Sequence, residues 1–222
     1  MSLIVSEKTL ELNIGAEILQ LIRQKHGCHC AFWIGMKQDQ EAGNGIDELI
    51  SNVPSGMHLA LQFKAPRSLP RNATPYRFTI NDRQNNNLLR LATIRQNAVF
   101  YVLPHYNTFT KMRSDSPALL TDTWLLRTWD LHNLPPSGNR FGTHTVASTP
   151  PLALVHSEPY PADISNAGKV IDSLFADGKN LESVLLNHTV IKNWLRKIID
   201  EGAGNKRAIG QRLRGFSTFC IS

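Results

Sequence analysis

The chain has 222 residues, of which 41% are hydrophobic and 19% are charged. This composition excludes wholesale disorder, collagen-like and low-complexity chains, and the length suffices for one large core. No apolar run approaches the roughly 18 residues of a membrane span, and the first residues lack the pattern of a secretory signal. Three cysteines imply no disulfide framework, so we expect a cytoplasmic protein that does not enter a membrane.

Basic side chains are concentrated in one segment of the chain, residues 64–113. This basic segment contains one acid, Asp82, and nine basic residues: Lys64, Arg67, Arg71, Arg77, Arg83, Arg90, Arg95, Lys111 and Arg113. Most of them are arginines, which bind phosphate through two parallel hydrogen bonds. The cluster therefore indicates nucleic acid, DNA in particular, as the partner. A solvated face paired with acids from distant segments remains the alternative.

Helix and strand signals alternate over the first hundred residues. A helix is expected from Ser6 to His26, with Gly27 after it and these apolar residues on one stripe: Leu10, Ile14, Ile18 and Leu21. The pattern next predicts strands over 30–36, 46–51 and 57–65, and a short strand over 76–80. A helix over 84–96 and a strongly apolar strand over 98–104 follow, and this strand is expected at the centre of a sheet.

The second half has weaker signals. Residues 123–131 and 151–157 are typical of strands, whereas 133–151 is rich in Pro, Gly and Ser and predicts an exposed connection. An amphipathic helix is expected from Asn180 to Gly202, followed by a basic tail. The fold class predicted is α/β, a mixed central sheet flanked by helices over residues 1–157, with a C-terminal helical extension over 158–222. This extension offers a surface for a partner protein or a second copy of the chain.

Three polar residues are expected to meet at one edge of the sheet. Asp47 opens the predicted strand over 46–51, after a glycine-rich turn, and Gln62 and Lys64 lie near the end of the strand over 57–65, with which it would form a hairpin. Residues two apart in a strand point to the same face, so a carboxylate, an amide oxygen and an ammonium converge. Glu17 lies at the border of the buried stripe of the first helix, where it either faces the sheet or reaches water.

These residues resemble the PD-(D/E)XK, or restriction-endonuclease-like, nuclease superfamily over about residues 6–104. The resemblance implies an αβββαβ core and hydrolysis of phosphodiester bonds in DNA. Metal-ligating carboxylates would hold Mg²⁺ or Mn²⁺, with Asp47, Gln62 and Glu17 as ligands and Glu41 as a rival of Glu17. The resemblance also implies that Lys64 assists the nucleophile. The phosphate backbone would then be held by four arginines: Arg67, Arg71, Arg77 and Arg83.

Two alternatives remain open. Gln62 stands where the family has an acid, so a catalytically inactive module that binds nucleic acid or a partner protein is the second interpretation. A group of aromatic residues after the central strand either stacks on bases or packs in the core; its members are Tyr101, His105, Tyr106 and Phe109. A role in defence against foreign DNA rests on analogy with restriction systems.

Overall fold

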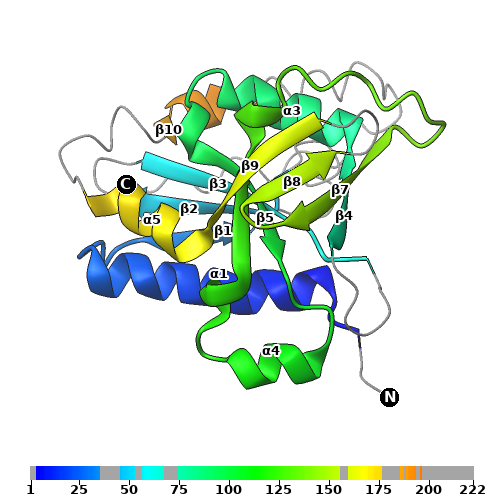
Figure 1. Cartoon of the computed structure of the whole chain (residues 1–222). Coiled ribbons are helices and arrows are strands. Elements are labelled where there is room, and N and C mark those ends of the chain that lie inside the picture. The colour runs from blue at the N-terminus through cyan, green and yellow to red at the C-terminus, as the bar shows by residue number, and fades with distance from the viewer. Residues whose placement is uncertain are drawn as a thin grey trace, which may run out of the picture.

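A curved ten-stranded sheet with helices on both faces organises the part of the chain that the structure describes (Figure 1). The computed structural model describes residues 4–35, 46–53, 57–67, 75–155, 160–176, 186–187, 189–193 and 196. The strands are β1 (Phe32–Gly35), β2 (Glu48–Val53), β3 (Met57–Phe63), β4 (Tyr76–Asn81), β5 (Val99–Pro104), β6 (Thr123–Arg127), β7 (Thr143–Thr149), β8 (Leu152–Val155), β9 (Tyr160–Asn166) and β10 (Leu186–Asn187). The α-helices are α1 (Glu7–Lys25), α3 (Asp82–Ala92), α4 (Phe109–Asp115) and α5 (Ala167–Ala176).

The strand order is β1-β2-β3-β5-β6-β9-β8-β7-β4, and β10 pairs with β3 outside this path. Strands β1, β2 and β3 form an antiparallel meander, whereas β3 and β5 are parallel and are connected through β4 and α3. All six residues of β5 are buried, which confirms the prediction of a central strand over 98–104. The sheet is thus mostly antiparallel and partly parallel, as the predicted α/β class with a mixed sheet requires.

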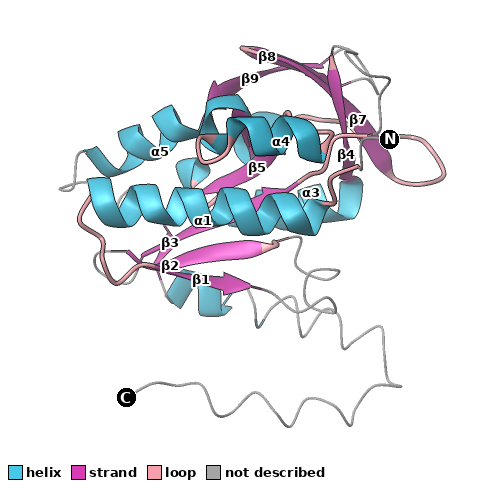
Figure 2. Cartoon of the chain, turned by 90° about the horizontal axis from the view of Figure 1, so that it is seen from below, coloured by secondary structure: helices cyan, strands magenta, loops and turns pink. Residues whose placement is uncertain are grey.

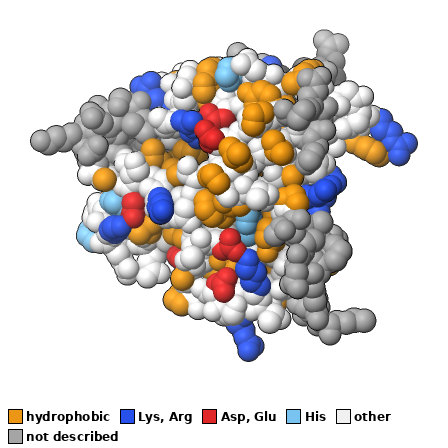
Figure 3. Space-filling view, viewed as in Figure 1, with side chains coloured by type: hydrophobic (Ala, Val, Ile, Leu, Met, Phe, Trp, Pro, Cys, Tyr) orange, Lys and Arg blue, Asp and Glu red, His pale blue; other side chains and the backbone are white. Residues whose placement is uncertain are grey.

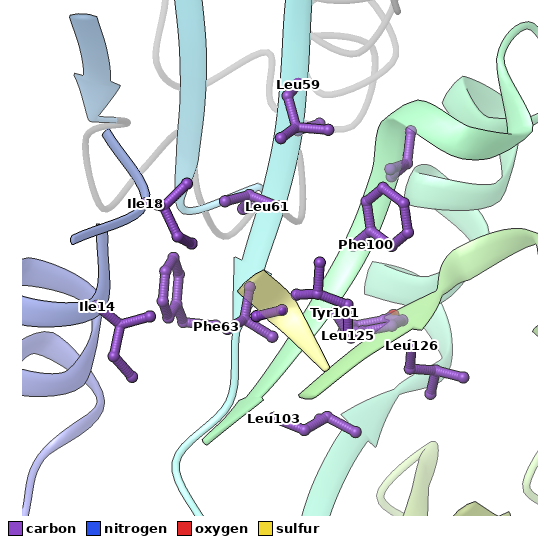
Figure 4. Packing of buried hydrophobic residues seen from close by; sticks show 14 of the residues in the cluster. Ile14, Ile18, Leu59, Leu61, Phe63, Phe100, Tyr101, Leu103, Leu125 and Leu126 are labelled. Atoms are coloured by element: carbon purple, nitrogen blue, oxygen red, sulfur yellow. The ribbon is translucent and has the colours of Figure 1, made fainter. Parts of the chain in front are cut away.

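Helix α1 forms as its sequence predicts. The side chain of Ser6 accepts a hydrogen bond from the backbone N–H of Thr9, and Gly27 adopts a φ of 67° just after the helix. The buried stripe of α1 covers the sheet, and Figure 4 shows Ile14 and Ile18 directed at side chains of β3. Replacing Ile14, which is fully buried, by alanine would cost about 3 kcal/mol of stability.

The helices lie in two layers. Seen from below in Figure 2, α1, α4 and α5 lie in front of the strands and α3 lies behind them. Side chains of β3 alternate accordingly: Leu61 and Phe63 face α1, whereas Gln62 faces the side of α3. No helix within the described residues combines the length and the apolar character needed to cross a membrane.

The second half of the fold corrects three expectations. Strand β7 occupies part of 133–151, which had been predicted as an exposed connection. Strand β9 lies between β6 and β8, so the sheet continues past residue 157 and the predicted boundary there is wrong. The helix predicted to begin at Asn180 is wrong at Leu186–Asn187, which is strand β10, whereas residues 189–193 and 196 are helical as predicted. These errors share a cause, because short strands far apart in sequence are specified by their partners in the sheet. The basic tail lies outside the described residues.

Candidate functional site

The hairpin of β2 and β3 brings Asp47 and Gln62 together. Glu48 pairs with Leu61, so Asp47 stands opposite Gln62, as the sequence predicted. Its carboxylate oxygen Oδ2 accepts hydrogen bonds from the Gln62 side-chain amide Nε2 at 2.6 Å and from the Phe63 backbone N–H at 2.7 Å. The carboxylate is thereby fixed across the end of β3.

The Asp47 carboxyl group is buried, with 7% of the residue exposed. Loss of solvation is the main cause that raises its pKa to about 7. The positive charge of Lys64 opposes this rise, the negative charge of Glu7 adds to it, and the two hydrogen bonds oppose it. A carboxylate that is costly to ionise gains stabilisation from any cation placed beside it.

The amide of Gln62 has one orientation that its neighbours permit. Nε2 donates to Asp47 Oδ2 and to the backbone oxygen of Phe63 at 3.1 Å, so a flipped amide would place an oxygen against two oxygens. The carbonyl oxygen Oε1 therefore points away from the Asp47 carboxylate. Gln62 is only 1% exposed, and no group within the described ranges donates to Oε1. This oxygen therefore lacks the hydrogen bond that a buried acceptor normally accepts.

A carboxylate that the sequence patterns did not single out also reaches the end of β3. Glu7 lies in the first turn of α1, and its Oε2 accepts a hydrogen bond from the backbone N–H of Ala65 at 2.9 Å. Its charge is close enough to raise the pKa of Asp47. An acid in the first turn of a helix is usually explained by the helix dipole, so no sequence pattern singles out Glu7 as a site residue.

Glu17 has a different role from the one predicted. Its carboxylate accepts hydrogen bonds from the backbone N–H groups of Leu119 at 2.7 Å and Leu120 at 3.3 Å, where a 3-10 helix begins. Burial nevertheless raises its pKa. Ten residues of α-helix separate Glu17 from Glu7, about 15 Å along the axis. The prediction that Glu17 ligates a metal with Asp47 is therefore corrected, and Glu41 lies outside the described residues.

Buried polar groups support the site from the side of α3. Tyr101 on β5 pairs in register with Gln62 on β3, so their side chains share a face of the sheet. The Tyr101 hydroxyl donates to Asn85 Oδ1 at 3.1 Å, and both residues are buried. Burial, together with the charge of Asp47, raises the pKa of Tyr101 well above its ordinary value.

The predicted phosphate-binding arginines are exposed where the structure describes them. Arg67, Arg77 and Arg83 all lie at the surface, whereas Arg71 lies outside the described residues. Arg67 is held against β4, because its Nε donates to Thr79 Oγ1 at 2.7 Å and its backbone N–H donates to the Arg77 oxygen at 2.7 Å. Lys64 is half-buried three residues before Arg67 and completes the polar end of β3.

The aromatic residues after the central strand are core residues with one exception. Tyr101 and Tyr106 are fully buried and His105 is 5% exposed, so none of them can stack on a base. Phe109 is 42% exposed. The packing alternative therefore holds for three of the four.

A second polar cluster has the order of a serine-hydrolase triad. His105 Nε2 lies 2.9 Å from Ser148 Oγ, and His105 Nδ1 lies 3.5 Å from Asp122 Oδ1. However, Ser148 is 1% exposed, and the ring of Tyr76 stacks on His105 with centroids 4.3 Å apart. A nucleophile needs access to its substrate, so this cluster connects β5 and β7 rather than forming an active site.

The side-chain oxygens at the end of β3 are of the type that binds a hard cation. Glu7 and Asp47 supply carboxylates and Gln62 supplies an amide oxygen, and Mg²⁺ and Mn²⁺ prefer oxygen ligands. Within the described ranges, no three His, Cys, Asp or Glu side chains form a metal-binding group. A site with three protein ligands would therefore need the Gln62 side chain to turn, because its amide N–H rather than its oxygen faces Asp47.

Comparison with known proteins gives no relative. No protein-family model, no curated protein and no solved structure matches the chain. The function must therefore be argued from the site.

Proposed function

We propose that this protein is a Mg²⁺- or Mn²⁺-dependent nuclease that hydrolyses phosphodiester bonds of DNA. The observation that carries the proposal is the buried Asp47 carboxylate held against Gln62 at the end of β3, with Glu7 close enough to raise its pKa and Lys64 two residues beyond Gln62. Exposed arginines follow directly at Arg67 and Arg77, where they would hold the DNA backbone.

The strand order supports the resemblance to the restriction-endonuclease-like core. An antiparallel meander, β1-β2-β3, is followed, after the inserted strand β4, by helix α3 and by β5, which runs parallel to β3. Helices α1 and α3 lie on opposite faces of this part of the sheet. A cytoplasmic location and a role in defence against foreign DNA belong to the same proposal by analogy.

Each residue has a defined part in the reaction proposed. Asp47, Gln62 and Glu7 would hold the cation, which when bound lowers the pKa of a water molecule and neutralises charge on the scissile phosphate. Lys64 would donate a hydrogen bond to the attacking oxygen or to a phosphate oxygen, where negative charge develops. Asp47 must be ionised to bind the cation, so cleavage is expected to increase from pH 6 to pH 8, across the pKa of about 7.

The test is cleavage of supercoiled plasmid and of linear duplex and single-stranded DNA, with Mg²⁺, with Mn²⁺ or with EDTA. Lys64→Ala is expected to lower the cleavage rate by at least about 100-fold. Lys169→Ala, at an exposed lysine of α5, is the matched control and should cut like the parent. A Lys64→Ala variant that cuts as fast as the parent would end the assignment.

One observation favours a second candidate, a binding module without catalysis. The Gln62 amide donates to the Asp47 carboxylate and so takes up part of the charge that a cation would neutralise. This candidate predicts no cleavage under any metal condition, but binding of DNA that weakens steeply with added salt. Cleavage and binding measured on one preparation separate the two candidates.

A further inference from the structure

The loop before β7 presents an aromatic ring to solvent. Phe141 is 65% exposed, and the guanidinium carbon of Arg140 lies 4.5 Å from the centroid of its ring. Figure 1 shows this loop extending beyond the sheet, and Figure 3 shows basic and hydrophobic side chains together at its tip. Large aromatic rings are usually buried, and a ring paired with a cation at the surface is a feature of nucleic-acid contacts.

The loop is held in shape by its own hydrogen bonds. Asn139 Oδ1 accepts from the backbone N–H groups of Phe141 at 3.0 Å and Thr143 at 3.3 Å. Gly138 and Gly142 have φ values of 65° and 58°, a conformation that favours glycine and that turns the chain on both sides of the tip. The exposure of Phe141 is therefore built into the backbone of the loop.

The loop is also tied to the start of α3 through Asp82. One carboxylate oxygen of Asp82 accepts from the Ser137 backbone N–H at 3.1 Å and hydroxyl at 2.8 Å, and the other lies 2.5 Å from His144 Nε2. The backbone N–H of Asp82 donates to the oxygen of Gly142 at 2.8 Å. Asp82, the single acid of the basic segment, thus makes its contacts with Ser137 and His144. It does not neutralise the charge of the neighbouring Arg83.

A cationic path connects the loop with the candidate site. Arg67 contacts Thr79 on β4, and β4 ends at Asn81, which pairs with Thr143 two residues after Phe141. Strand and chain spacings place Lys64 and Phe141 no more than about 40 Å apart, or about twelve nucleotides at the roughly 3.4 Å spacing of one strand in a duplex. Within the described ranges, no ion pair engages four arginines along this path: Arg67, Arg77, Arg83 and Arg140.

We infer that Phe141 stacks on an unpaired base of a nucleic-acid strand whose phosphates lie along Arg67, Arg77, Arg83 and Arg140. That the partner is a nucleic acid rests on the proposed function. The inference adds a preference for single-stranded or strand-separated DNA. Every base has a face on which an aromatic ring can stack, whereas a paired base inside a duplex hides that face. Arg140 lies over the ring and supplies a charge for the adjacent phosphate.

Binding is measured in the presence of EDTA, so that the DNA is not cleaved during the measurement. The probe is a single-stranded oligonucleotide of about 15 nucleotides that carries the fluorescent base 2-aminopurine, compared with the same strand in a duplex. Phe141→Ala is expected to weaken single-strand binding about tenfold and to abolish the quenching of 2-aminopurine, while duplex binding changes little. Phe141→Trp should restore both, and Phe109→Ala, at an exposed phenylalanine on α4, is the matched control. Arg140→Gln should lower the salt dependence of single-strand binding by about 0.7 in logarithmic slope.

The outcomes separate this inference from the proposed function. Phe141→Ala binding that equals the parent, or an equal loss for duplex and single strand, overturns base stacking and leaves the nuclease proposal intact. A parent protein that binds neither strand overturns both. A parent that binds no nucleic acid but whose self-association, followed by ultracentrifugation, depends on Phe141 would assign the loop to a protein contact instead.

Discussion

Replacing Asp47 by asparagine tests the site through stability, with no substrate present. The pKa of Asp47 is about 7 in the folded protein, against about 4 for an aspartate in an unfolded chain. The folded state therefore binds this proton more tightly than the unfolded chain does. The stabilisation that results from this proton is complete below about pH 4 and is lost as the pH rises through about 7. The full difference is about 4 kcal/mol, of which about 3 kcal/mol is lost between pH 5 and pH 8. Asparagine does not titrate and keeps an acceptor for Gln62 and Phe63.

The assay is urea denaturation at pH 5 and pH 8, with EDTA, on the parent and Asp47→Asn. Between these pH values the free energy of unfolding of the parent should fall by about 3 kcal/mol more than that of the variant. Asp163→Asn, at an exposed aspartate on β9, should behave like the parent. Magnesium at 100 times its Kd should then stabilise the parent by about 2.7 kcal/mol at pH 8 and the variant far less. Parallel pH profiles of the two proteins would refute the raised pKa of Asp47. Equal stabilisation of the two proteins by Mg²⁺ would refute the role of Asp47 as a ligand.

Three further substitutions test the other residues of the site. Glu7→Gln should lower the pKa of Asp47, seen as a shift of the stability profile to lower pH, and weaken Mg²⁺ binding in a thermal-shift titration; an unchanged titration would remove Glu7 from the ligands. Gln62→Glu should destabilise the protein in EDTA by about 2 kcal/mol, because the new carboxylate then lies against that of Asp47. The same variant should bind Mg²⁺ about tenfold more tightly, and a loss of affinity would contradict the ligand role of this position. Glu17→Ala should lower the free energy of unfolding by about 1–2 kcal/mol, because two backbone N–H groups lose their acceptor, and leave cleavage per folded molecule unchanged; a cleavage defect without a stability defect would restore Glu17 to the active site.

The hairpin was predictable from the sequence because its signals are local. The alternation of apolar and polar residues through Gln62 indicates which face of the sheet each side chain takes, and a slip by one residue would turn every side chain to the wrong face. Helix α1 and strand β5 were predictable for the same reason, since a cap, an apolar stripe and a buried run each lie within one segment.

Only the tertiary structure decided which acid of α1 reaches the end of β3. Helical periodicity gives the angle at which a side chain leaves the axis, and it placed Glu17 correctly at the border of the buried face, where that residue is half-buried. It gives no information on where along the axis the helix meets the end of β3, and there the first turn with Glu7 arrives. The positions of β7, β9 and β10 depend in the same way on strands distant in the chain, because pairing partners rather than local propensity determine short strands.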